Sequence, residues 1–188
     1  AGNKSNYSIT EIGYAKYQVV DNQGTDGTDT LNNVEKLRFS DQEIDITPHR
    51  FTDKSNLQTA IDAWINDQDA AAENYGLIIN WDVSGITDFS NLFEGKTTFN
   101  SDISNWDVSN GTRFDYMFYG ASSFNQDISS WDVTNIGRLG LGAMFYGASS
   151  FNQDISSWDV SKNKDFTFMF RGASSFNQDI SSWDVSSG

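Results

Sequence analysis

The sequence predicts an α/β repeat solenoid, a right-handed stack of about 25-residue repeats with short parallel strands, an N-terminal helical cap and a small preceding β segment. The main observation is a Trp-Asp-Val-Ser block, or its Thr variant, that occurs five times with spacings of 25, 25, 27 and 25 residues. The copies begin at Trp81, Trp106, Trp131, Trp158 and Trp183. Repeats this short cannot bury an apolar face alone, so successive copies are expected to stack and to present each surface position as a ladder.

Two domains are expected, a β-rich segment at residues 1–50 and a repeat domain at residues 51–188. The first alternates apolar and polar residues as strands do, with Gly-Asp turn clusters between them, and Pro48 marks its end. In the second, residues 51–79 form the helical cap and residues 80–188 the repeats. The cap should hold a helix that starts with a capping box at Ser55–Gln58 and a second from about Asp69 to Tyr75.

Each repeat is expected to contain one strand, because Ile128-x-x-Trp131-x-Val133 has the zero, three, five spacing of a leucine-rich repeat strand. Trp and Val then point inward and the residue between them points outward. That outward residue is always aspartate: Asp82, Asp107, Asp132, Asp159 and Asp184. Carboxylates at a strand spacing of about 4.8 Å repel one another. A divalent cation or cationic ligand would relieve this. The alternative, which the copying of repeats favours, is that each Asp accepts hydrogen bonds from nearby hydroxyls and amides.

A second ladder follows the buried aromatic residue of each Phe-Asn-x-Asp-Ile run. It is expected to satisfy backbone groups in turns and so to be structural. Its members are Asn100, Asn125, Asn152 and Asn177.

The block from Met117 to Thr134 returns nearly unchanged from Met144 and from Met169. Over about residues 55–188 the chain resembles the BspA-type leucine-rich repeat of bacterial surface proteins, also known from mycoplasma lipoproteins. The resemblance implies a secreted or surface-anchored protein of adhesion and binding. It carries over no catalytic residues.

The segments Gly24–Leu31 and Val34–Asp41 are similar to the part that follows or closes the calcium-binding RTX repeats of large exported proteins. Gly-Asp turns of that kind offer oxygen ligands to Ca²⁺, so Asp26 and Asp29 are the candidate metal ligands, and Ca²⁺ is the only cofactor expected. The full RTX nonapeptide is absent, and the alternative is that both residues only form turns.

Composition limits the partners. Twelve basic and 26 acidic residues give a net charge of −14, which repels phosphate, so neither nucleic acid binding nor membrane insertion is expected. The chain contains no cysteine, which rules out disulfides and thiolate metal sites. It is expected to be a monomeric segment of a longer chain.

The copies diverge between the Trp-Asp-Val block and the Met-Phe pair, and the third copy is two residues longer there. Insertions in solenoids often mark the binding side. Aligned from the strand, Asp88, Arg113, Arg138 and Asp165 share one ladder position, so that opposite charges pair at both ends. Aromatic rings beside basic groups suit a sugar or a peptide. The predicted ligand-binding residues are Arg113, Tyr116, Tyr119, Arg138, Tyr146, Phe168 and Arg171. The alternative is that Tyr116 and Phe168 pack under a neighbouring turn.

The sequence therefore predicts a non-catalytic module of a large extracellular bacterial surface protein. Its ligand would be a glycan or a protein on another cell or surface. The alternative is a structural spacer that extends and stiffens an adhesin. An enzyme is not expected, because the Asp ladder offers carboxylate pairs on an exposed surface without a cleft, and His49 lies in a linker.

Overall fold

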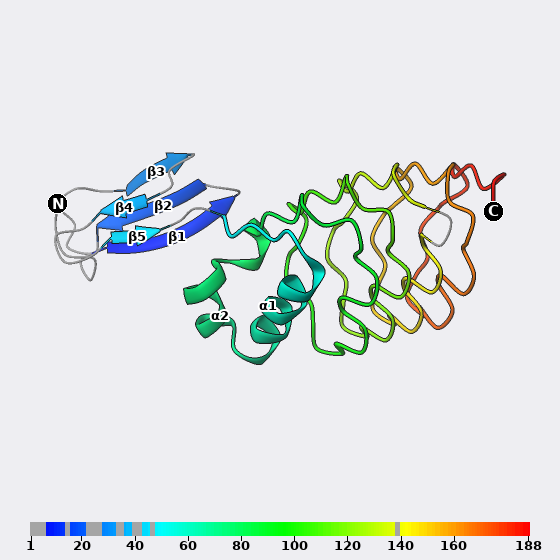
Figure 1. The fold of residues 1–188 in the computed structure, drawn as a ribbon, viewed down its shortest axis with the longest axis horizontal. Coiled ribbons are helices and arrows are strands. Elements are labelled where there is room, and N and C mark those ends of the chain that lie inside the picture. The colour runs from blue at the N-terminus through cyan, green and yellow to red at the C-terminus, as the bar shows by residue number, and fades with distance from the viewer. Residues whose placement is uncertain are drawn as a thin grey trace. The chain divides into compact units, whose positions relative to one another are not determined.

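The computed structural model describes residues 7–13, 16–21, 28–32, 36–38, 43–45, 48–137 and 140–188. The chain divides into two compact units, Ala1–His49 and Arg50–Gly188. In the first unit, β1 (Tyr7–Gly13), β2 (Lys16–Asp21) and β3 (Thr28–Asn32) form an antiparallel sheet in the order β1-β2-β3 (Figure 1). A second antiparallel pair joins β4 (Lys36–Arg38) and β5 (Glu43–Asp45). The extended segments predicted for this part of the chain are thus present as strands.

The second unit begins with two helices, α1 (Lys54–Asn66) and α2 (Gln68–Tyr75). The sequence predicted both helices, but it placed the N-cap of α1 wrongly. Asp53 is the cap, and its carboxylate accepts the backbone N–H of Asn56 at 2.9 Å. Gln58 is not part of a capping box; its side chain donates to the Leu92 carbonyl at 3.0 Å. The helix is thereby bonded to the first repeat.

The predicted fold class is wrong for the repeats. Within the described part of residues 50–188 there are only α1, α2, a short 3₁₀ helix η2 (Ile78–Asn80), turns and isolated bridges, so the repeats do not form parallel strands. The cause lies in the block taken for a strand. Trp131 N–H donates to the Ile128 carbonyl across a turn, and the Asp132 carboxylate then accepts the Thr134 N–H at 3.0 Å. An aspartate that bonds the backbone two residues ahead bends the chain where a strand would have to continue.

The repeats still stack, as irregular coils that lie side by side (Figure 1). We number the coils from the Ile three residues before each Trp: coil 1 is 78–102, coil 2 is 103–127, coil 3 is 128–154 and coil 4 is 155–179. Backbone bonds join the Met-Phe pairs of successive coils, each Phe N–H to the Met carbonyl of the next coil. The Phe118 N–H donates to the Met144 carbonyl and the Phe145 N–H to the Met169 carbonyl, both at 2.9 Å. Regular coil-to-coil bonding therefore includes the start of the block that the copies share.

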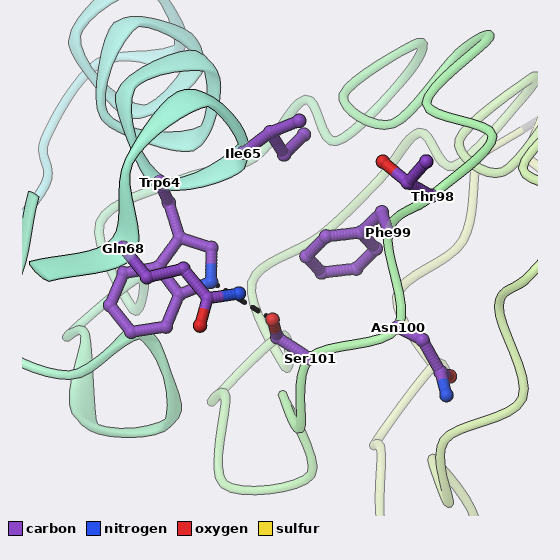
Figure 2. Close-up of a pocket in the computed structure, with 7 residues that line it drawn as sticks. All are labelled: Trp64, Ile65, Gln68, Thr98, Phe99, Asn100 and Ser101. Atoms are coloured by element: carbon purple, nitrogen blue, oxygen red, sulfur yellow. Dashed lines mark hydrogen bonds between the residues drawn. The ribbon is translucent and has the colours of Figure 1, made fainter.

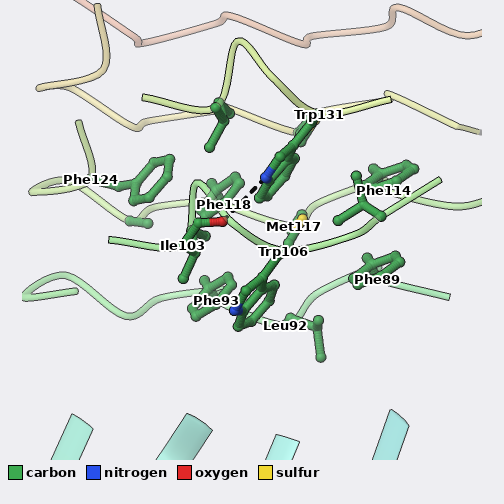
Figure 3. Packing of buried hydrophobic residues seen from close by; sticks show 14 of the residues in the cluster. Phe89, Leu92, Phe93, Ile103, Trp106, Phe114, Met117, Phe118, Phe124 and Trp131 are labelled. Atoms are coloured by element: carbon green, nitrogen blue, oxygen red, sulfur yellow. Dashed lines mark hydrogen bonds between the residues drawn. The ribbon is translucent and has the colours of Figure 1, made fainter. Parts of the chain in front are cut away.

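Columns of aromatic rings fill the core. Phe93, Phe118, Phe145 and Phe170 stack nearly parallel, with centroid separations of 5.2, 5.6 and 5.7 Å. Figure 3 shows the first two of these rings. A second column contains Phe99, Phe124, Phe151 and Phe176.

In coils 2 to 4 the Trp indole N–H also bonds to the coil before it. Trp131 donates to the Ile103 carbonyl at 3.2 Å (Figure 3). Trp158 donates to the Ile128 carbonyl at 3.1 Å. These bonds satisfy buried polar groups on both sides of each coil boundary.

A candidate ligand-binding ladder of aromatic residues

The aspartate ladder is part of the scaffold. Each carboxylate accepts the N–H of the residue two positions later, from Asp82 with Ser84 to Asp184 with Ser186. Hydrogen bonds from the Thr134 hydroxyl and backbone hold the pKa of Asp132 below its usual range, despite the neighbouring charge of Asp159. The favoured alternative for this ladder, that each Asp accepts nearby hydroxyls and amides, is confirmed.

The asparagine ladder is structural too, as predicted. The Asn125 N–H donates to Asn100 Oδ1 at 2.9 Å, and the next two members repeat this bond at the same distance. Gln side chains add a second bond between coils, such as Gln126 Nε2 to the Asn100 carbonyl. Each Asn therefore supplies the acceptor that the following coil needs.

One position in each coil has an unusual backbone. Asn91, Tyr116, Ala143 and Phe168 occupy it in coils 1 to 4, with φ of 62°, 58°, 52° and 57°. A bulky residue in the left-handed region is an outlier, because its Cβ crowds the following carbonyl. Tyr116 is nevertheless 43% exposed and Phe168 is 56% exposed. The alternative that these two rings pack under a neighbouring turn is wrong.

The exposed rings belong to a continuous row that we call the aromatic ladder: Tyr116, Tyr119, Tyr146, Phe168 and Arg171. Tyr116 lies 5.7 Å from Tyr119, which stacks on Tyr146 at 4.7 Å between centroids. The Arg171 guanidinium lies 5.8 Å from the Tyr146 ring and 5.2 Å from the Phe168 ring. The ladder thus joins coils 2, 3 and 4 and ends in a cation held between two rings.

Arg113 makes different contacts. Its guanidinium binds Asp115 through Nε at 3.1 Å and Nη2 at 2.9 Å, and lies 3.6 Å from Asp88. Asp88 in turn accepts from Lys54 at 3.0 Å. Burial disfavours the Asp88 charge, but the bonds from Ser90 and Lys54 outweigh it and lower its pKa. The Arg113 charge is therefore neutralised by neighbours that the fold itself supplies.

The predicted ladder alignment of Asp88, Arg113, Arg138 and Asp165 is wrong at the third coil. Phe89 N–H bonds to the Arg113 carbonyl and Phe114 N–H bonds to the Gly140 carbonyl, so Gly140 is the counterpart of Arg113. The two extra residues of coil 3 shift the register before that point. Arg138 itself lies outside the described residues, and the predicted pairing with Asp165 has no counterpart at Gly140.

The predicted Ca²⁺ ligands stay a prediction. Asp26 lies outside the described residues, and Asp29 belongs to β3, where it pairs with Val19. In the part of the chain that the structure describes, no group of three or more His, Asp or Glu side chains is arranged to hold a metal ion. No helix in that part is long and apolar enough to cross a membrane.

Sequence reasoning missed one further cavity, beside the helices. A pocket of about 390 Å³ lies between the end of α1, the start of α2 and the turn at residues 98–101 (Figure 2). Its lining residues are Trp64, Ile65, Gln68, Thr98, Phe99, Asn100 and Ser101. The available signal was the asparagine ladder, whose first member has no Asn in a preceding coil.

Comparison with known proteins gives one family. The family model described as "Mycoplasma protein of unknown function, DUF285" matches residues 64–183. No curated protein and no solved structure matches the chain significantly.

Proposed function

Because the match covers more than half of its length, the chain belongs to the DUF285 family of mycoplasma proteins of unknown function, and we propose that it is a non-catalytic ligand-binding module of a bacterial surface protein. Its ligand is a glycan or a protein on another cell or surface. The aromatic ladder is the contact site. The protein that contains it is secreted or attached to the cell surface.

One observation carries the proposal. Tyr116 and Phe168 hold large rings in solvent from a backbone conformation that disfavours them. A left-handed non-glycine residue costs about 1–3 kcal/mol, and such strain is concentrated at functional sites. Asn91 takes the same position in coil 1, and asparagine tolerates this conformation well. The fold therefore accepts an inexpensive residue there, yet two coils carry costly exposed aromatics.

The chemistry of the ladder suits binding rather than catalysis. Tyr and Arg are enriched where interfaces concentrate their binding energy. The stacked Tyr119 and Tyr146 give a firm base, and Arg171 adds a charge-assisted donor between two rings. Sugar rings and aromatic or acidic peptide side chains match this combination of apolar faces and directed donors.

A spacer is the second candidate, and the regularity of the core favours it. Four nearly parallel Phe rings run through the coils, and hydrogen bonds repeat at each boundary. A stack of this kind transmits load along its length whether or not its surface binds anything. The two functions differ in one respect: ligand binding requires the exposed aromatic residues, whereas a spacer does not.

A glycan and peptide array, probed with and without Ca²⁺, tests the proposal first. A ligand found there is then titrated against the double variant Tyr116→Asn/Phe168→Asn, which places in coils 2 and 4 the residue that coil 1 already uses. We expect binding to weaken by about 30-fold or more, the loss of at least one interface hot spot. We expect the stability in urea to stay equal or to rise, because the backbone strain is relieved.

Ser123→Ala is the matched control. This residue is exposed in coil 2, and its hydrogen bond uses the backbone N–H alone. Unchanged affinity in the double variant would reject the ladder as the binding site. An array that stays silent under both conditions would favour the spacer.

A further inference from the structure

The pocket beside α1 and α2 lies where the stack of coils begins, and it shares no residue with the aromatic ladder. Trp64 and Gln68 line it from the helices and Phe99 lines it from coil 1, while the Asn100 side chain points away from it (Figure 2). The Trp64 indole donates to Ser101 Oγ at 2.9 Å and so fixes one wall. The helices thus pack beside coil 1 but leave this pocket between themselves and the turn at residues 98–101.

Backbone N–H groups in the later coils show what this space lacks. The Ser123 N–H donates to the Thr97 carbonyl at 3.2 Å, and the Asn125 N–H donates to Asn100 Oδ1 at 2.9 Å. Coils 3 and 4 repeat both bonds with their own preceding coils. Each coil therefore directs two N–H groups, two residues apart, toward the coil before it.

In coil 1 the equivalent donors are the N–H groups of Thr98 and Asn100. Both residues line the pocket, and among the described residues neither N–H has a hydrogen-bond partner. Their partners in later coils are a backbone carbonyl and, three residues further on, an Asn side-chain carbonyl. An acceptor pair with this spacing would therefore satisfy both N–H groups.

The lining also defines the charge of the ligand. All seven residues are neutral, and their polar groups are amides and hydroxyls around the edges of two aromatic rings. Its volume lies within the range of about 300–1,000 Å³ typical of ligand pockets. A neutral lining in a strongly acidic chain favours an uncharged polar ligand over an anion.

We propose that this pocket binds a short extended peptide carrying an asparagine side chain, which completes the asparagine ladder at its open end. The peptide's backbone carbonyl accepts from the Thr98 N–H, and its Asn carboxamide oxygen accepts from the Asn100 N–H. The peptide occupies the place of a preceding coil, as an added strand does at a sheet edge.

The test uses the 188-residue chain labelled with ¹⁵N and the peptide acetyl-Ser-Ser-Phe-Asn-Gln-amide, the sequence that coils 2 to 4 share. We expect the Thr98 and Asn100 amide signals to shift and their hydrogen exchange to slow. A peptide with Leu in place of Asn should bind about tenfold more weakly, because it covers the Asn100 N–H without supplying an acceptor.

A second arm blocks the pocket. Gln68→Trp fills it from α2 and should abolish binding, whereas Ala70→Trp, on the same helix outside the lining, should not. Unmoved Thr98 and Asn100 signals in the unmodified chain would overturn the proposal, and so would equal binding of the Leu peptide. Shifts produced by N,N′-diacetylchitobiose and not by the peptide would also overturn it, in favour of an acetamido sugar.

Discussion

At the scale of single residues, aspartate decides the local structure of each coil. Asp127, Asp132, Asp154 and Asp159 each accept the N–H of the residue two positions later. Hydrogen bonds from that residue lower the pKa of all four. In the sequence these aspartates suggest a charged outer face. In the structure their carboxylates are hydrogen-bonded to the nearby backbone.

Two substitutions of Asp132 distinguish the contribution of its hydrogen bonds to stability from that of its charge. Asp132→Ala should lower the free energy of unfolding by about 1 kcal/mol, since the Thr134 N–H and hydroxyl both lose their acceptor. Asp132→Asn keeps an acceptor oxygen and should cost less. Urea titrations at pH 7 measure both, and equal losses in the two variants would contradict this role.

The pH dependence follows from the direction of the shift. The folded-state pKa of Asp132 is lowered, so its contribution is fully present above the unfolded pKa of about 3.9 and is lost as the pH falls through the folded value. The unmodified chain should therefore lose more stability between pH 5 and pH 3 than Asp132→Asn does.

At the scale of elements, the bonded segment of each coil depends on a glycine after the Met-Phe pair. Gly95, Gly120, Gly147 and Gly172 all have positive φ, between 68° and 80°. At Gly120 an added Cβ would lie 3.8 Å from the Gly95 Cα, an ordinary contact. The requirement there is for the backbone conformation and not for space.

Gly120→Ala should consequently destabilise the chain by about 1–2 kcal/mol, the cost of a left-handed alanine. Gly120→Asn should cost less, because asparagine enters this region more readily. Thermal unfolding followed by circular dichroism measures the order of the three proteins. An alanine variant as stable as the parent would show that the turn tolerates another conformation.

Helices and coils differ in how well the sequence predicts them. The periodicity of Leu57, Ile61 and Trp64 identifies α1, since residues three and four apart share one face of a helix. The spacing of Trp and Val correctly puts both inside, but it does not distinguish a strand from a pair of turns that bury the same side chains. The hydrogen bonds that each Asp accepts from the backbone two residues later favour the turns over a strand.

The candidate site is predictable to a similar degree. The repeat spacing brings Tyr119 beside Tyr146 because both follow a Met-Phe pair. It misplaces Arg138, because alignment from the Trp crosses a two-residue insertion. No sequence signal marks the left-handed backbone at Tyr116 and Phe168, since residues as different as Asn91 and Ala143 occupy the same position in the other coils.

At the scale of the whole molecule, each coil contacts only its neighbours, so the stability of the unit is a sum of coil and boundary terms. Phe118 is fully buried and stacks on a ring from each side, Phe93 and Phe145. Phe170, the last ring of the column, is half-buried. It stacks on Phe145, the ring before it in the column, and so on one side only.

Phe118→Ala should accordingly cost about 3–5 kcal/mol, the range for a large buried aromatic. Phe170→Ala should cost clearly less, because part of its surface is already in water. Denaturant midpoints measured at a common slope provide the comparison. Equal losses would mean that the coils do not behave as a nearest-neighbour stack.

The indole hydrogen bonds between coils restrict the insertions and deletions that the sequence can accept over generations. From Trp106 onward each Trp reaches an Ile carbonyl one coil back, so a gain or loss of a few residues between these anchors would leave a donor and an acceptor buried and unmatched. Coil 3 nevertheless carries two extra residues, and they lie between bonds at Gly137 and Gly140. Duplication of whole coils and length changes in that single stretch are therefore the viable routes of divergence, and the second alters the surface while leaving the register of every indole unchanged.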